Sequence, residues 1–272
     1  MLTLYQLALQ RVVTLRISVA TAPDNVREDY ELLSSVPSDA TLRCATLPIA
    51  QLMMARMSNT RASKGAASAG RTDLLTYLRD TSRLEGDVAN EAARKGHVPV
   101  LELLHEWGVD CDEESANVAA REGHVPALEL LHEWGVDCNE WGVIEAAENG
   151  HVSVLQLLHE WGVDCDEGAA DAAAKKGRVR VLKLLHEWGV DCTVAGANSA
   201  AKNKHIAVLR LLHGWGVTCN VKGANMAAMY GHVSVLELLH RWGVDCDIKS
   251  AIVAAKNGHI PIMRLLCEWR IL

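Results

Sequence analysis

A seven-letter phrase, HEWGVDC, recurs with small changes every 27 residues through the C-terminal two thirds of this sequence. Its tryptophan returns at constant spacing, at Trp107, Trp134, Trp161, Trp188, Trp215, Trp242 and Trp269. Self-similarity at a fixed period of this length is typical of an array in which one small structural unit stacks on the next. Such an array presents a long surface and no single deep cleft. The repeat therefore favours a binding scaffold over an enzyme.

Each unit is predicted to begin with a short helix. In the unit 112–138, Asp112 can accept a hydrogen bond from a free N–H group of the first helical turn. The equivalent positions hold side chains of the same short polar class, namely Asn139, Asp166, Thr193, Asn220 and Asp247. Gly123 is expected to end this helix, because glycine adopts the left-handed conformation without steric cost.

A second helix is predicted to start near Pro126, a residue that suits a first helical turn. Its apolar residues share one face at helical spacing: Val125, Leu128, Leu130 and Leu131. Helices of about ten residues do not persist alone in water. Stability must therefore come from the faces that successive repeats bury against each other.

The predicted fold is an all-α solenoid of helix–turn–helix repeats over residues 62–272, with seven helix pairs and no sheet. A degenerate copy at Gly70–Asp80 is interpreted as its N-terminal cap. Residues 1–61 are assigned to a separate N-terminal segment, either a targeting sequence or a small helical module. The stretch 58–68 (SNTRASKGAAS) is predicted to be a polar linker.

The repeat resembles ankyrin repeats over about residues 62–272. The segment AAREGHVPALELLHEWGVDCNE has their paired Ala, Gly-His, Leu-rich second helix and Gly-x-Asp exit. However, the unit has 27 residues where ankyrin repeats have about 33, and the Thr-Pro-Leu-His tetrapeptide with its β-hairpin finger is missing. The sequence is more similar to short ankyrin-like arrays of algae, oomycetes and large DNA viruses, whose repeats read like GHLEVLKWLHENG and often carry a Trp at the place of Trp141. This resemblance implies protein–protein recognition by a fold that has lost its hairpin fingers.

The charge distribution argues against nucleic acid as a partner. Residues 1–84 hold ten Lys and Arg against seven Asp and Glu, so residues 85–272 hold 17 against 27, a net charge of −10. An acidic body of this kind repels a phosphate backbone. No stretch of 18 apolar residues occurs, so no membrane span is expected.

The first 22 residues leave two interpretations open. They contain Arg11 and Arg16 and no acidic residue, as organelle transit peptides do. A helix that docks on the array would have the same composition. We expect a cytoplasmic or nuclear protein, with organelle targeting by residues 1–22 as the alternative.

Six cysteines recur in one column: Cys111, Cys138, Cys165, Cys192, Cys219 and Cys246. Stacked helices lie about 8–10 Å apart. That spacing exceeds the 4.4–6.8 Å or so between the Cα atoms of a disulfide, and the ligands of one zinc ion lie closer still. Each Cys is therefore predicted to be a small buried apolar residue, with no metal and no cofactor. Eight unpaired thiols indicate a reducing compartment.

The twelve histidines fall into two columns. One column follows the turn glycine, at His97, His124, His151, His205, His232 and His259, with Arg178 as the exception. The other precedes the Trp, at His105, His132, His159, His186, His213 and His240. A catalytic His needs a partner that is special to one place, so identical His in every repeat indicate hydrogen bonds to loop backbone, and no catalytic residue is predicted. A pH-dependent array is the alternative.

The Trp column is predicted to pack over the following repeat, and the alternative is an exposed aromatic recognition ladder. Positions that vary between repeats can specify a partner, and most of them at the ends of the first helices are basic. The candidate partner-binding residues are Arg94, Arg121, Lys175, Lys176, Lys202, Met229, Tyr230 and Lys256. Simple solvation of this surface is the alternative.

The predicted function is that of a monomeric, non-enzymatic scaffold that binds a protein partner along its repeats. The alternative is a substrate receptor for a ubiquitin ligase, because ankyrin arrays are sometimes joined to an F-box. Leu47–Pro48–Ile49 is the only trace of such a module.

Overall fold

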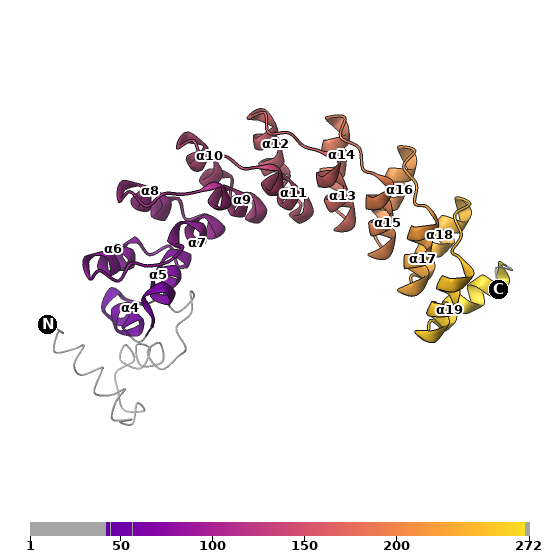
Figure 1. Ribbon diagram of the computed structural model, residues 1–272, viewed down its shortest axis with the longest axis horizontal. Coiled ribbons are helices and arrows are strands. Elements are labelled where there is room, and N and C mark those ends of the chain that lie inside the picture. The colour runs from indigo at the N-terminus through magenta and orange to yellow at the C-terminus, as the bar shows by residue number, and fades with distance from the viewer. Residues whose placement is uncertain (1–41, 44, 56, 270–272) are drawn as a thin grey trace, which may run out of the picture. The chain divides into compact units, whose positions relative to one another are not determined.

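The computed structural model describes residues 42–43, 45–55 and 57–269, and all regular secondary structure in this part of the chain is helical (Figure 1). The chain divides into two compact units. The described residues of the first unit run to Ala119 and include 126–137, and the second unit comprises 120–125 and 138–269. None of these helices is long and apolar enough to cross a bilayer.

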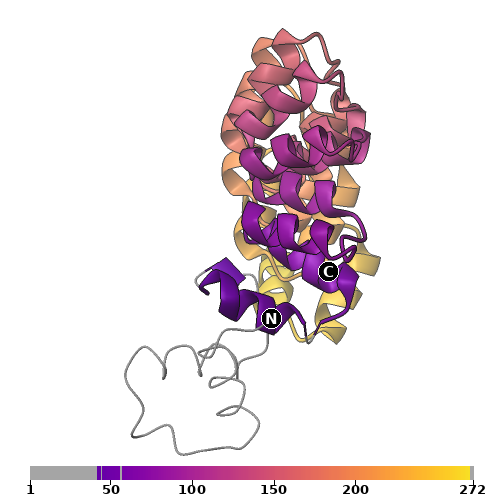
Figure 2. The ribbon, with the colours of Figure 1, turned by 90° about the vertical axis from the view of Figure 1, so that its left-hand side faces the viewer.

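Helices α4 to α10 follow one another from the start of the described chain, and α9 runs across the boundary between the units. Figure 2, which faces the N-terminal end, shows the helices of the first unit stacked one above another. The bounds are α4 (Leu47–Met54), α5 (Asn59–Ser68), α6 (Thr72–Asp80), α7 (Val88–Lys95), α8 (Val98–Glu106), α9 (Glu113–Glu122) and α10 (Val125–Glu133).

The second unit contains five helix pairs in regular succession. Their bounds are α11 (Glu140–Asn149), α12 (Val152–Glu160), α13 (Glu167–Lys175), α14 (Val179–Glu187), α15 (Val194–Lys202), α16 (Ile206–Gly214), α17 (Val221–Met229), α18 (Val233–Arg241), α19 (Ile248–Lys256) and α20 (Ile260–Glu268). With α5–α6, α7–α8 and α9–α10 these make eight pairs, one more than the seven predicted, and the described residues contain no strand. The predicted all-α repeat solenoid is confirmed.

Two layers of helices form within the second unit. The first helices of successive repeats (α11, α13, α15, α17, α19) pack against one another along their length, whereas the second helices touch less. Small side chains explain the difference, because the first helices bury alanine pairs such as Ala146–Ala147. The second helices fill the space between the layers with larger groups, such as Val154, Leu155 and Leu158.

The predicted starts and ends of the first helices are confirmed. All six polar residues of the Asp112 column cap a helix. Asp166, for example, accepts a hydrogen bond from the N–H of Ala169 at 3.2 Å, and Thr193 from that of Ala195 at 3.0 Å. The turn glycines adopt the left-handed conformation, with φ of 85° at Gly123. In the fifth repeat Lys204 takes the same conformation, with φ of 63°, although it has a side chain.

One prediction about the N-terminal region is wrong. Residues 58–68 are not a linker, because 59–68 form α5, which packs against α6 and α7 and buries Ala62, Ala66 and Ala67. Small residues suit this close approach, and α5 and α6 together make a complete helix pair at the start of the array. Leu47–Pro48–Ile49 form the first turn of α4. The predictions for residues 1–41, including organelle targeting, lie outside the described residues.

Candidate functional site

The candidate partner-binding residues lie at the C-terminal ends of first helices or directly after them. Arg94 belongs to the first unit, where it lies 3.5 Å from Glu91 within α7. Arg121 lies in the last turn of α9 and belongs to the second unit, 3.1 Å from Glu122 and 4.0 Å from Glu145 of α11. These two basic side chains are therefore accompanied by acidic neighbours.

Lys175 and Lys176 share one acidic partner. Their Nζ atoms lie 3.3 Å and 3.2 Å from Oε1 of Glu148, which belongs to the preceding first helix. Burial raises the pKa of Glu148, but the hydrogen bonds and charges of the two lysines outweigh this effect, so that its pKa lies below the ordinary value. The carboxylate stays ionised and offsets part of the positive charge at this end of α13.

Lys202 and Tyr230 form the second group of candidate residues. The ammonium of Lys202 lies 5.5 Å from the centroid of the Tyr230 ring, a cation–π contact between neighbouring repeats. The Tyr230 ring remains 52% exposed, and Met229 beside it is also exposed. Lys256, on the next first helix, is exposed and has no ion pair among the described residues.

The first histidine column joins each repeat to the one before it, as its structural interpretation predicts. His205 and His232 donate from Nε2 to the carbonyl oxygens of Lys175 and Lys202, at 3.0 Å and 2.8 Å. The acceptor lies at the end of the preceding first helix, not in a loop as predicted. Arg178, the exception in the sequence, donates from Nε to the equivalent carbonyl of Glu148 at 2.9 Å.

The turn glycines leave room for these rings. A Cβ added at Gly123 would lie 2.5 Å from Nδ1 of His151 in the next repeat. A Cβ at Gly177 would lie 2.7 Å from Nδ1 of His205. Glycine is therefore favoured at these two turns by the left-handed backbone and also by the histidine that packs over it.

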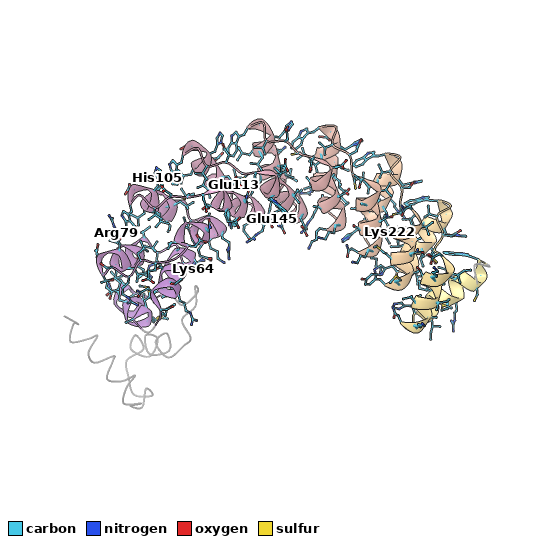
Figure 3. All side chains as sticks on the ribbon, viewed as in Figure 1. Lys64, Arg79, His105, Glu113, Glu145 and Lys222 are labelled. Atoms are coloured by element: carbon cyan, nitrogen blue, oxygen red, sulfur yellow. The ribbon has the colours of Figure 1, made fainter. Side chains whose placement is uncertain are left out.

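The second histidine column pairs with the Trp column. His159 stacks on Trp188, and the same contact joins His105 to Trp134, His186 to Trp215, His213 to Trp242 and His240 to Trp269. In the cap, the guanidinium of Arg79 lies 4.6 Å from the centroid of the Trp107 ring, in the place of the missing His. Arg79 and His105 both lie on the second-helix side of the first unit (Figure 3). The Trp rings are half-buried packing elements, as predicted, but each of these five rings packs on the preceding repeat and not on the following one.

Three histidines of this column also contact an aspartate of their own repeat through Nδ1. His186 Nδ1 lies 2.5 Å from Asp191, His240 Nδ1 lies 2.5 Å from Asp245, and His132 contacts Asp137 in the same way. The carboxylates of Asp191 and Asp245 thereby help to orient the rings of His186 and His240, which stack on Trp215 and Trp269.

A polar contact between repeats went unrecognised in the sequence. The side chains of Asn198 and Asn225 reach the cap residues of the next repeat. Asn198 donates to Asn220 at 3.0 Å and accepts from its N–H at 3.2 Å, and Asn225 binds Asp247 in the same reciprocal way, at 3.0 Å and 2.8 Å. In this column, spaced by 27 residues, positions 90, 117, 171, 198 and 225 hold Asn or Asp and only Ile144 interrupts them, and this recurrence is the signal that could have revealed the contact.

The cysteine column is largely buried, as predicted. Cys138, Cys192, Cys219 and Cys246 are buried, whereas Cys111 and Cys165 are half-buried. Burial raises the pKa of Cys219 to about 12 and, with smaller effects of Asp112 and Asp110, that of Cys111 to about 11. The described part of the chain contains no group of three His, Cys, Asp or Glu that could hold a metal ion.

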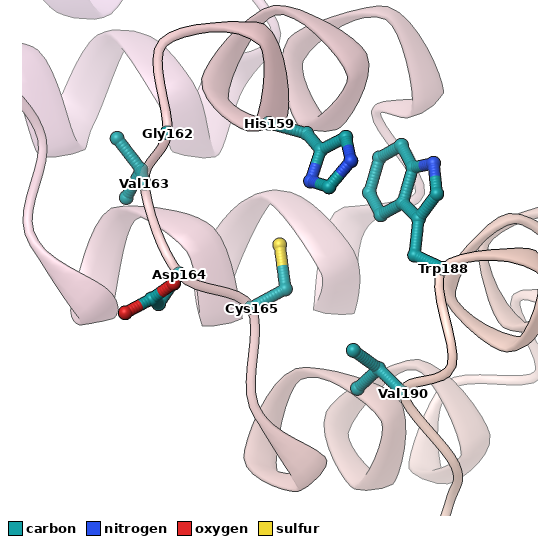
Figure 4. Close-up of a pocket in the computed structure, with 7 residues that line it drawn as sticks. All are labelled: His159, Gly162, Val163, Asp164, Cys165, Trp188 and Val190. Atoms are coloured by element: carbon teal, nitrogen blue, oxygen red, sulfur yellow. The ribbon is translucent and has the colours of Figure 1, made fainter.

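A small pocket opens beside one of the His–Trp stacks. It has a volume of about 230 Å³, and His159, Cys165 and Trp188 lie on its wall (Figure 4). Val163, in the loop after α12, and Val190, in the loop after α14, also line the pocket. Because burial also raises the pKa of Cys165, its thiol stays protonated and offers no nucleophile here.

An apolar row on the first-helix layer was also missed. Val194, Val221 and Ile248, the first residues of α15, α17 and α19, are 44%, 50% and 58% exposed. Trp141, at the second position of α11, is 69% exposed. Figure 3 shows Glu145 of α11 and Lys222 of α17 on this same side of the second unit.

The fold and its inter-repeat contacts define a helical repeat solenoid. Residues 117–159 match the family model for ankyrin repeats in many copies, so that ankyrin repeats are detected in this sequence. Among solved structures, the chain is similar to the human ASB11 ankyrin repeat domain. The match covers 57% of this chain and 84% of the ASB11 chain, with 22% sequence identity and a TM-score of 0.49. No curated protein matches the sequence.

Proposed function

We propose that this chain is a non-enzymatic scaffold of the short, 27-residue ankyrin type, which binds a protein partner along its first-helix layer. One observation carries the proposal. The side chains that recur in most repeats are in contact with neighbouring repeats, as in the His186–Trp215 stack and the Asn198–Asn220 contact. The side chains that vary between repeats, such as Lys202 and Tyr230, are left exposed on the first-helix layer. Stability and recognition thus use different columns of the same repeat.

Charge and an aromatic side chain support the assignment of the binding residues. Arg121, Lys175, Lys176, Lys202 and Lys256 place positive charge on the second unit, with Arg94 at the equivalent place in the first. Complementary charge steers the encounter of two proteins and sets their orientation. Binding energy concentrates in a few residues, often Tyr, Trp or Arg, and the exposed Tyr230 with Met229 is of this kind. A partner with an acidic face and an apolar centre would fit this surface.

The test is affinity purification of the tagged full chain, with mass spectrometry of the recovered proteins. A Tyr230→Ala variant serves as the comparison, because its ring is half exposed and outside the core. We expect the wild type to recover one or more proteins that the Tyr230→Ala variant does not. The substitution should weaken the binding of these proteins by about 1–2 kcal/mol. The matched control is Glu187→Ala on the exposed side of α14, which should recover the same proteins as the wild type.

Two outcomes would reject the proposal. Recovery of the same proteins by the wild type and by the Tyr230→Ala variant would place the binding surface elsewhere. A melting curve of the Tyr230→Ala variant shifted far below that of the wild type would show that Tyr230 belongs to the core.

A further inference from the structure

The first helices of the second unit change their chemistry along the array. Helices α11 and α13 carry acidic residues, such as Glu140, Glu148 and Glu167. The next three first helices contain no Asp or Glu: they read VAGANSAAK in α15, VKGANMAAM in α17 and IKSAIVAAK in α19. Four lysines lie on these three helices, namely Lys202, Lys222, Lys249 and Lys256. The last three repeats therefore present a cationic and apolar first-helix layer.

The apolar part of this layer is a row that crosses the repeats. Val194, Val221 and Ile248 occupy the first position of their helices, where the three preceding first helices, α9, α11 and α13, have glutamates. Val194 and Val221 have a further repeat on both sides, so their exposure does not result from an open end of the array. Because neighbouring first helices pack together, about 8–10 Å separates successive members of the row.

The acidic groups near the row are already engaged. Asp171 accepts two hydrogen bonds from Thr193, at 2.7 Å and 2.6 Å. Asp247 caps α19 through the N–H of Ser250 at 2.8 Å and accepts from Asn225 at 3.0 Å. Asp191 and Asp245 bind histidines on the second-helix side.

Two lysines lie beside the row, and one of them, Lys249, interacts electrostatically with Asp247. Lys222 and Lys249, each next to a member of the row, are exposed and form no ion pair within the described part of the chain. Ile248 and Lys249 also border an open hollow of about 490 Å³, together with Cys246 and Asp247, whose carboxylate is held by Ser250 and Asn225. An apolar side chain of a partner could enter this hollow with an acidic group beside it.

We propose that Val194, Val221 and Ile248, with Lys222 and Lys249, bind an acidic peptide segment of the partner protein. The segment would carry apolar side chains about 10 Å apart, one for each repeat, with Asp or Glu between them. This inference rests on the proposed function and places the partner's anchor at the helix starts, at the opposite end of the first helices from Tyr230. A second copy of this chain is a poor occupant, because it would bring lysines against lysines.

The test uses a random 16-residue peptide library displayed on phage and selected on the immobilised full chain. We expect selected peptides enriched in Asp and Glu together with Leu, Ile or Val. The test variant is Val194→Glu/Val221→Glu/Ile248→Glu. It introduces the residue that Glu113, Glu140 and Glu167 provide at the same helix position, so the fold should tolerate it. We expect this variant to keep the melting curve of the wild type and to bind the selected peptides at least tenfold more weakly.

The matched control is Glu113→Gln/Glu140→Gln/Glu167→Gln, which changes three charges at the equivalent positions of other repeats and should leave the Kd unchanged. The inference is overturned if no peptide is selected, if the selected peptides are basic, or if the triple Glu variant binds them as tightly as the wild type. It is also overturned if sedimentation equilibrium shows a wild-type dimer that the variant loses. Protein partners recovered equally by wild type and triple variant would reject this inference and leave the proposed function standing.

Discussion

The imidazole of His186 stacks on the indole of Trp215 in the next repeat, with ring centroids 4.0 Å apart and an interplanar angle of 15°. The same ring binds Asp191 through Nδ1 at 2.5 Å. One histidine thus connects a loop of its own repeat to the second helix of its neighbour. The recurring phrase HEWGVDC contains all three residue types of this contact: the His, the Trp and the Asp.

Loss of one stack should weaken one interface of the array. We expect His186→Ala to lower the free energy of unfolding by about 1 kcal/mol, because an aromatic pair contributes about 0.5–1.5 kcal/mol beyond its buried area. Urea denaturation followed by circular dichroism measures the change. A double-mutant cycle with Trp215→Leu supplies the control, since the two effects should not add. Additive effects would show that the rings do not stabilise each other.

Arg178 should be replaceable by the residue that the other repeats use. We expect Arg178→His to keep the stability of the wild type, because His205 makes the same hydrogen bond to a carbonyl one repeat later. Arg178→Ala should lose about 1 kcal/mol, the typical net contribution of one hydrogen bond. Thermal denaturation of both variants measures this difference. Equal melting temperatures would mean that the bond to Glu148 contributes nothing.

Lys204 should be the site of a stabilising substitution. It adopts a left-handed backbone with φ of 63°, a conformation that costs a residue with a side chain about 1–2 kcal/mol. Glycine adopts it freely but loses more entropy on folding, so we expect Lys204→Gly to stabilise the protein by about 1 kcal/mol or less. Gly231→Lys at the equivalent turn is the reverse control and should destabilise it. A lower melting temperature for Lys204→Gly would contradict the assignment of strain.

The buried thiols should make stability fall at alkaline pH. Burial raises the pKa of Cys219 to about 12 and that of Cys246 to about 11, whereas an unfolded thiol ionises near 8.5. Below about pH 8.5 the thiols are neutral in both the folded and the unfolded state, so their contribution to the free energy of unfolding is fully present. As the pH rises from there toward 12, only the unfolded state gains from ionisation, so the contribution is progressively lost. Urea midpoints at pH 8 and pH 10 measure the loss, with Cys219→Ala as the comparison that should lose less.

Exposure should also order the reactivity of the thiols. Cys267 is exposed, and Cys219 and Cys246 are buried. Alkylation of the native protein at pH 8 with peptide mapping should therefore modify Cys267 before Cys219 and Cys246. Early modification of Cys219 would contradict the burial on which the pH prediction depends.

The helices could be predicted because their signals are local. Asp166 caps α13 through an N–H group three residues away, and Gly123 ends α9 through its own backbone. The segment 58–68 was misassigned because its Ala, Ser and Gly residues resemble a linker in composition. Only the proximity of α7 shows that such small side chains pack closely and form a helix.

The candidate binding surface could be predicted in part. The variation between repeats was enough to select Lys202 and Tyr230. In the structure both side chains are exposed and they contact each other. The row of Val194, Val221 and Ile248 was not recognised, because an apolar residue at a helix start has no local sign of whether a neighbour covers it. Exposure is a property of the packed array.

The sequence by itself determined the period, the two helices of each repeat, their ends and the stacking of equivalent faces. These depend on residues within a few positions of each other and on a repeat that places the same apolar groups on every unit. The tertiary structure alone decided which columns meet. His186 and Trp215 are 29 positions apart and Asn198 and Asn220 are 22 apart, and neither interval is the period of the repeat. The offset between neighbouring helices sets those pairings, and it arises only when the small side chains of the first helices come into contact.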